Sequence, residues 1–94
     1  MNAAEATHYT NHNVLVLALM EAKAQRTTLR REGERTATLT RKTTGTLTEK
    51  IAAAKAAWAP FLVDIAAKDD EIAAMEAQCD AEWQAYIDAG YPTE

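Results

Sequence analysis

The chain has 94 residues, of which 48% are hydrophobic, and a formal net charge of −4. Alanine supplies 21 of the apolar residues, so few large side chains remain to build a core, and the length suits a single domain (1–94). The sequence has no serine and only one cysteine, which excludes a serine nucleophile and an intramolecular disulfide. No apolar run approaches the ~20 residues that span a bilayer, so we expect no membrane partner.

The first third of the chain divides into a polar segment and an amphipathic one. Residues 1–12 are small and polar without periodicity, so we expect them to form an arm. Apolar residues then recur on one face from Leu15 to Leu29, which predicts a helix over 13–32 that begins with a buried apolar run. Gly33 is expected to end this helix, because glycine readily adopts the left-handed conformation found at many helix C-termini.

The apolar run that begins at Val14 also resembles the core of a signal peptide. Secretory signals start with positive charge, whereas the residues before this run include Glu5 and neither lysine nor arginine. We therefore expect no signal peptide, and a location in the cytoplasm or in a virion.

Residues 33–46 differ in composition from their neighbours. Nine threonines lie between Thr27 and Thr48, and large apolar residues are scarce among them. Threonine loses rotamer freedom in a helix and favours extended backbone. We therefore expect a threonine-rich basic connector at 33–46, with a short strand or hairpin as the alternative for part of it.

The segment after the connector carries the clearest helix signals. Thr46 and Glu49 form a capping box, in which the threonine hydroxyl accepts a hydrogen bond from the glutamate N–H and the carboxylate reaches back. We predict one long helix over 47–89. We expect it to be kinked near Pro60, which has no backbone donor, and to end at Gly90, with residues 90–94 as a tail.

Bulky apolar residues recur every seven positions along this predicted helix. Six consecutive heptads of this kind are typical of a coiled-coil-like seam, although Lys68 and Glu82 interrupt its second position. We expect the seam and its flanking residues to form a protein–protein interface. The predicted interface residues are Ile51, Trp58, Phe61, Leu62, Ile65, Ile72, Met75, Cys79, Trp83 and Tyr86.

The predicted helix lengths differ. At 1.5 Å per residue, the long helix would extend ~64 Å and the first helix only ~28 Å, less than half of the seam. The uncovered part would expose large apolar side chains unless another chain covered it. We therefore expect a protein partner, either further copies of the chain in a homo-oligomer or a larger assembly.

Charge is distributed unevenly along the sequence. Residues 1–22 carry −2, residues 23–50 carry +5 and residues 51–94 carry −7. The basic part could pair with the acidic part or contact phosphate groups or acidic proteins. We do not expect nucleic acid as the main partner, because the chain is acidic overall and has no recognised DNA-binding motif. The candidate contact residues are Arg30, Arg31, Arg35, Arg41 and Lys42.

Groups that could carry chemistry are few. Glu5, His8 and His12 would share a helix face, but no fourth metal ligand is apparent. Cys79 stands at a seam position among acidic neighbours, which disfavour a reactive thiolate. The acids at 69–71 are interpreted as a solvated helix face. We therefore expect no catalytic residue, metal or cofactor.

Together these patterns predict an all-α chain, a helical hairpin or bundle with a long kinked C-terminal helix. We expect a non-enzymatic structural or assembly protein that acts through helix–helix contacts, with a component of a viral particle (cement, connector or adaptor) as the concrete form. Two alternatives remain. One is a small inhibitor or adaptor that binds a host protein through the acidic residues Asp64, Glu71 and Asp88, and the other is a nucleic-acid or nucleotide binder that uses the basic connector.

Overall fold

The computed structural model describes residues 3–43 and 45–90, and of Thr43 only the backbone. These residues form two α-helices, α1 (Ala3–Thr43) and α2 (Leu47–Asp88), and contain no strand. The predicted all-α helical hairpin is confirmed. The alternative of a short strand or hairpin in the threonine-rich segment is wrong for the described residues.

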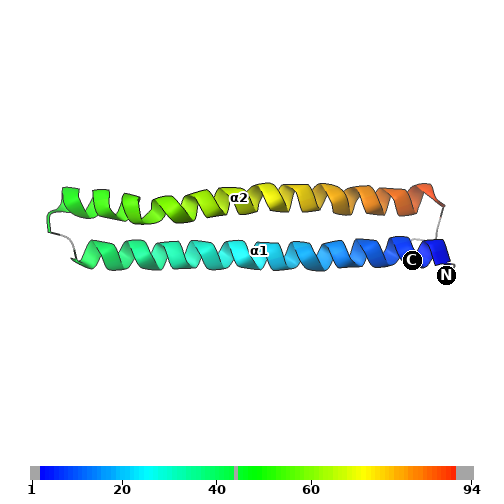
Figure 1. Ribbon diagram of the computed structural model, residues 1–94, viewed down its shortest axis with the longest axis horizontal. Helices are drawn as coiled ribbons and strands as arrows, with labels where there is room; N and C mark the ends of the chain where they lie inside the picture. Colours follow the sequence, from blue (N-terminus) through cyan, green and yellow to red (C-terminus); the bar gives the residue numbers. More distant parts are fainter. Residues whose placement is uncertain (1–2, 44, 91–94) are drawn as a thin grey trace. The chain divides into compact units, whose positions relative to one another are not determined.

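The chain forms two compact units, and each contains one segment of each helix. Unit 1 comprises Met1–Lys23 and Glu71–Glu94, and unit 2 comprises Ala24–Asp70. Within each unit, the α1 and α2 segments run antiparallel and side by side (Figure 1). Unit 2 also contains the short connection between the helices, whereas unit 1 contains the beginning of α1 and the end of α2.

The start of α2 confirms the predicted capping box. The backbone N–H of Glu49 donates to the Thr46 hydroxyl oxygen at 3.2 Å, and the Lys50 N–H donates to the Thr46 carbonyl at 2.9 Å. The Thr46 hydroxyl in turn donates to the Glu49 carboxylate at 3.0 Å. The first of these bonds satisfies a backbone N–H that the first helical turn leaves open, and the carboxylate reaches back to the capping hydroxyl.

The threonine-rich segment is helical over residues 33–43, so the predicted connector is wrong for those residues, and Gly45 and Thr46 lie between the two helices. α1 runs through it to Thr43, and threonine hydroxyls are accommodated by bonds to carbonyls one turn earlier. Thr28 donates to the Ala24 carbonyl at 3.2 Å, and Thr40 donates to the Thr36 carbonyl at 2.9 Å. The weak helix propensity of threonine costs only tenths of a kcal/mol per residue, which packing against a second helix outweighs.

Gly33 does not end the first helix, contrary to the sequence prediction. It lies inside α1 and is buried, and Trp58 of α2 packs directly over it. A Cβ atom at Gly33 would lie 2.8 Å from Trp58 Cε3, closer than real Cβ contacts. The glycine therefore provides space for the indole ring, and this packing holds α1 and α2 together in unit 2.

The predicted N-terminal arm at 1–12 is also wrong over its described part. α1 begins at Ala3, ten residues before the predicted start, and the Thr7 hydroxyl donates to the Ala3 carbonyl at 2.9 Å. Sequence periodicity misses this segment because its inward positions are polar. Glu5 and His8 bond to Tyr86 and Glu82 of the same unit, contacts that a local pattern does not reveal.

α2 agrees closely with its prediction. The helix spans Leu47–Asp88, one residue shorter than the predicted 47–89. Gly90 has a φ of +76°, a conformation that favours glycine. The helix continues through Pro60, although that residue has no N–H to donate to the preceding turn. Most of the predicted tail at 90–94 lies outside the described residues.

The length of α1 removes one argument for a partner. α1 has 41 residues and α2 has 42, so the predicted mismatch between a short and a long helix is wrong. In each unit, the α2 seam is faced by a segment of α1. A surface that binds another chain would therefore lie on the outer faces of the helices, away from the seam.

Candidate protein–protein interface

Most predicted interface residues pack within the chain. The buried and half-buried positions of α2 alternate in steps of three and four residues, as the heptad pattern predicts. Two predicted residues, Ile51 and Leu62, lie exposed beside this seam. Ile72, Cys79 and Tyr86 are buried, and Trp58, Phe61, Ile65, Met75 and Trp83 are half-buried.

The polar residues that interrupt the seam have partners on α1. In unit 1, His8 Nδ1 lies 2.9 Å from Glu82 Oε1. In unit 2, the Lys68 ammonium donates to the side-chain oxygen of Gln25 at 2.8 Å. These pairs fix which turns of the two helices oppose each other within each unit, because a shift in register would separate them.

Unit 1 also contains an aromatic cluster. The rings of Trp83 and Tyr86 stack with centroids 5.3 Å apart, Tyr9 lies 6.2 Å from Tyr86, and His12 lies 5.1 Å from Trp83. The Tyr86 hydroxyl donates to the Glu5 carboxylate at 3.4 Å. The buried Nδ1 of His12 has no hydrogen-bond partner in the described part of the chain. Packing of these rings thus joins the end of α2 to the start of α1, which the sequence predicts to be an arm.

A strip of large apolar side chains on α1 lies outside this packing. We call Val14, Leu17 and Met20 the outer strip, and they are 59%, 65% and 62% exposed. Their spacing of three residues places them on adjacent turns of one face. Leu15 and Leu19, between them in sequence, are half-buried, as expected for residues that face α2. The prediction that this apolar run is buried as a whole is therefore wrong.

Unit 2 carries an exposed apolar groove on α2. The groove is lined by Lys55, Trp58 and Leu62 and has a volume of about 350 Å³. We call it the Trp58 groove. Ile51 lies one heptad before Trp58 and is also exposed, so apolar surface continues along this flank of α2.

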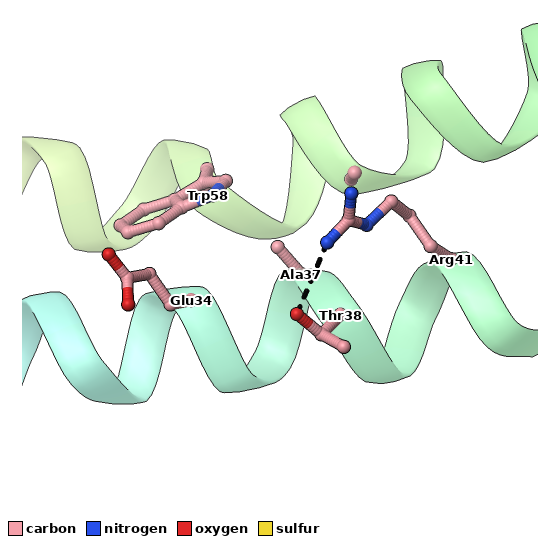
Figure 2. A pocket seen from close by; sticks show the side chains of 6 residues that line it. Glu34, Ala37, Thr38, Arg41 and Trp58 are labelled. Carbon is pink, nitrogen blue, oxygen red and sulfur yellow. Dashed lines mark hydrogen bonds between the residues drawn. The ribbon is translucent and has the colours of Figure 1, made fainter.

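A second hollow of unit 2 is more polar. It has a volume of about 360 Å³ and lies between the two helices. Figure 2 shows the Trp58 ring above Glu34, and the bond of 3.2 Å that Arg41 donates to the Thr38 hydroxyl. Its lining residues are Glu34, Ala37, Thr38, Arg41, Ala54 and Trp58.

The predicted basic contact residues fall into two groups. Arg30 lies 3.3 Å from Glu34 on the same helix, and Arg41 contacts the polar hollow, so both already have neighbours in unit 2. Arg31, Arg35 and Lys42 are exposed on α1 and make no ion pair with the described residues. These three positions remain available to an acidic or phosphate-bearing partner.

Ion pairs join the helices inside each unit. In unit 1, Lys23 lies 3.6 Å from Glu76. In unit 2, Arg26 donates to the Asp69 carboxylate, and this bond, with the attraction between the charges, raises the pKa of Arg26 above its ordinary value. Both pairs are solvent-exposed, and exposed pairs of this kind contribute little to stability.

The side chains that could carry chemistry are buried, lie apart from one another, or are bonded to other residues of the chain. Cys79 is 7% exposed and lies in the seam. Among the described residues, no group of three or more His, Cys, Asp or Glu side chains could hold a metal ion. Asp64, Glu71 and Asp88, which were predicted for an acidic contact surface, are exposed on α2, and Gln84 donates to Asp88 at 2.8 Å.

Comparisons with known proteins leave the function open. No family model matches the chain, and neither curated proteins nor solved structures include a match. Within 3–43 and 45–90, neither helix has a stretch long and apolar enough to cross a membrane. Proposals about function therefore rest on the surfaces described above.

Proposed function

We propose that this protein is a non-enzymatic structural or assembly protein that associates with other protein chains, first of all further copies of itself, through helix–helix contacts. The outer strip is the observation that carries the proposal. Val14, Leu17 and Met20 are each more than half exposed although α2 is already packed against the opposite face of α1. Full burial of one such side chain contributes about 1.5–3 kcal/mol, so covering the strip would drive association.

The placement of the reactive groups supports a role without catalysis. The Cys79 thiol is buried, which closes it to a substrate, and His8 is bonded to Glu82 on the facing helix. The exposed faces instead combine apolar side chains with charges of both signs, as contact surfaces do. A component of a viral particle stays a prediction from the sequence, because none of these contacts bears on it.

A second candidate function is supported by the basic residues of α1. Arg31, Arg35 and Lys42 are exposed and make no ion pair with the described residues, so they could bind an acidic protein or a phosphate-bearing molecule. Binding of that kind weakens steeply with salt, whereas apolar association does not. Salt dependence therefore separates the two candidates.

Replacement of one strip residue tests the proposal. Leu17→Lys places a charge in the centre of the outer strip and should reduce self-association to the monomer, as measured by light scattering. Leu39→Lys is the matched control, because Leu39 is also an exposed leucine of α1 but lies outside the strip. Circular dichroism should show that both variants keep the helix content of the wild type. Equal association of both variants and the wild type would contradict the proposal.

A further inference from the structure

We infer that the outer strip of one copy docks in the Trp58 groove of a second copy, so that unit 1 of one chain contacts unit 2 of the other. This inference rests on the proposed function and specifies its partner and contact surfaces. The outer strip belongs to unit 1, and the groove belongs to unit 2. Both surfaces are apolar, and neither is covered in the described chain.

The charges of the two units determine which surfaces can meet. Unit 1 contains eight acidic residues and one lysine, a net charge of −7. Unit 2 contains nine basic and six acidic residues, a net charge of +3. Contact between two copies of unit 1 would bring like charges together, whereas contact of unit 1 with the other copy's unit 2 brings opposite charges together. The outer strip is therefore expected to avoid its own counterpart and to dock on unit 2.

The Trp58 groove has the chemistry that the outer strip requires. Its wall is formed by Trp58 and Leu62, and aromatic side chains in partly open pockets are frequent anchors of protein interfaces. Its volume of about 350 Å³ has room for a leucine or methionine side chain. Leu17 or Met20 of the second copy therefore fits this groove by polarity and size.

A charged pair at the edge can set the orientation of the docked helix. Lys55 lines the groove, and Glu21 follows Leu17 by four residues on α1, hence one turn further along the same side. With Leu17 in the groove, the Glu21 carboxylate of the second copy comes within reach of the Lys55 ammonium. Opposite charges at the rim of an apolar contact add selectivity and faster association.

The inferred contact joins two different surfaces. Such a contact closes a dimer if each copy uses both of its surfaces on the same neighbour, and it builds a ring or filament if the surfaces engage different neighbours. Either outcome suits an assembly role. The molar mass of the complex distinguishes a closed dimer from larger species.

A charge exchange tests the inference. Lys55→Glu and Glu21→Lys should each weaken self-association about five- to tenfold, because each replaces an attraction by a repulsion. The double variant restores the attraction with reversed signs and should associate about as well as the wild type. Lys50→Glu is the matched control for net charge, since it lowers the charge of unit 2 equally at a residue outside the groove, and it should weaken association less than Lys55→Glu does. Association constants come from sedimentation equilibrium.

The outcomes separate this inference from the proposed function. If the wild type associates and Leu17→Lys abolishes association, but the double charge exchange does not restore it and Leu62→Lys has no effect, the Trp58 groove is not the docking site. The proposed function would then stand and this inference would fall. If the wild type is monomeric at every concentration, both fall together. Rescue by the double variant, with Lys50→Glu weakening association less than Lys55→Glu, supports the inferred contact.

Discussion

The indole ring of Trp58 occupies the space that Gly33 leaves on the facing helix. A Cβ atom added at Gly33 would lie 2.8 Å from Trp58 Cε3, so no larger residue fits without movement of the ring. Glycine in a helix interior costs about 1 kcal/mol relative to alanine, which the packing of the indole must offset. The pair therefore defines how α1 and α2 meet in unit 2.

Gly33→Ala should lower the stability of the protein despite its better helix propensity. The gain of about 1 kcal/mol in propensity is outweighed by the displacement of the indole ring from Gly33, since overpacking of this kind costs about 1–3 kcal/mol. The measurement is the free energy of unfolding in urea at a fixed chain concentration. The sign should reverse in a Trp58→Leu background, where the added methyl group has space. Stabilisation by Gly33→Ala in the wild-type background would contradict the described packing.

Thr46→Ala should remove the N-terminal cap of α2. The Thr46 hydroxyl accepts a bond from the Glu49 N–H and donates one to its carboxylate, and loss of a cap costs about 1 kcal/mol. Thr48→Ala is the matched control, because Thr48 is an exposed threonine two residues later, inside the helix. Thermal unfolding followed by circular dichroism should show a lower midpoint for Thr46→Ala only. Similar midpoints for both variants would contradict a capping role.

The His8–Glu82 pair offers a test of unit 1. Glu82→Ala removes the contact of 2.9 Å with His8 and should cost about 1 kcal/mol in the free energy of unfolding. Replacement of both residues by leucine should cost less or even stabilise, because two apolar side chains then meet at a seam position. A urea titration of the single and double variants at neutral pH measures both effects. An equally large loss in the double variant would show that the polar pair itself is needed.

The sequence predicts one helix well and the other poorly. α2 was predictable because its signals are local: a capping box at Thr46, apolar residues every seven positions, and Gly90 at the end. The limits of α1 were not predictable, because its polar N-terminal turns and threonine-rich C-terminal turns carry weak local helix signals. Gly33 resembles a helix stop until the residue that packs on it, Trp58, is known.

Most of the predicted interface residues pack against α1 of the same chain. The heptad residues of α2 indicated a contact surface correctly, but α1 of the same chain occupies most of it. The sequence analysis predicts the apolar run at 14–20 to be buried, and the structure exposes the three outer-strip residues within it. The angular positions of the residues around the helix axis distinguish the exposed residues from the buried ones, since Leu17 lies about 200° around the helix from both Leu15 and Leu19. A residue in that position points away from the seam.

The most direct test of the account is the molar mass of the wild-type protein in solution. Light scattering over a wide concentration range should show a mass above the 10.3 kDa of one chain, and the mass should rise with concentration. Added salt should weaken this association without abolishing it, because charges assist a contact that apolar side chains drive. A constant mass of 10.3 kDa at every concentration and salt level would contradict self-association through the outer strip.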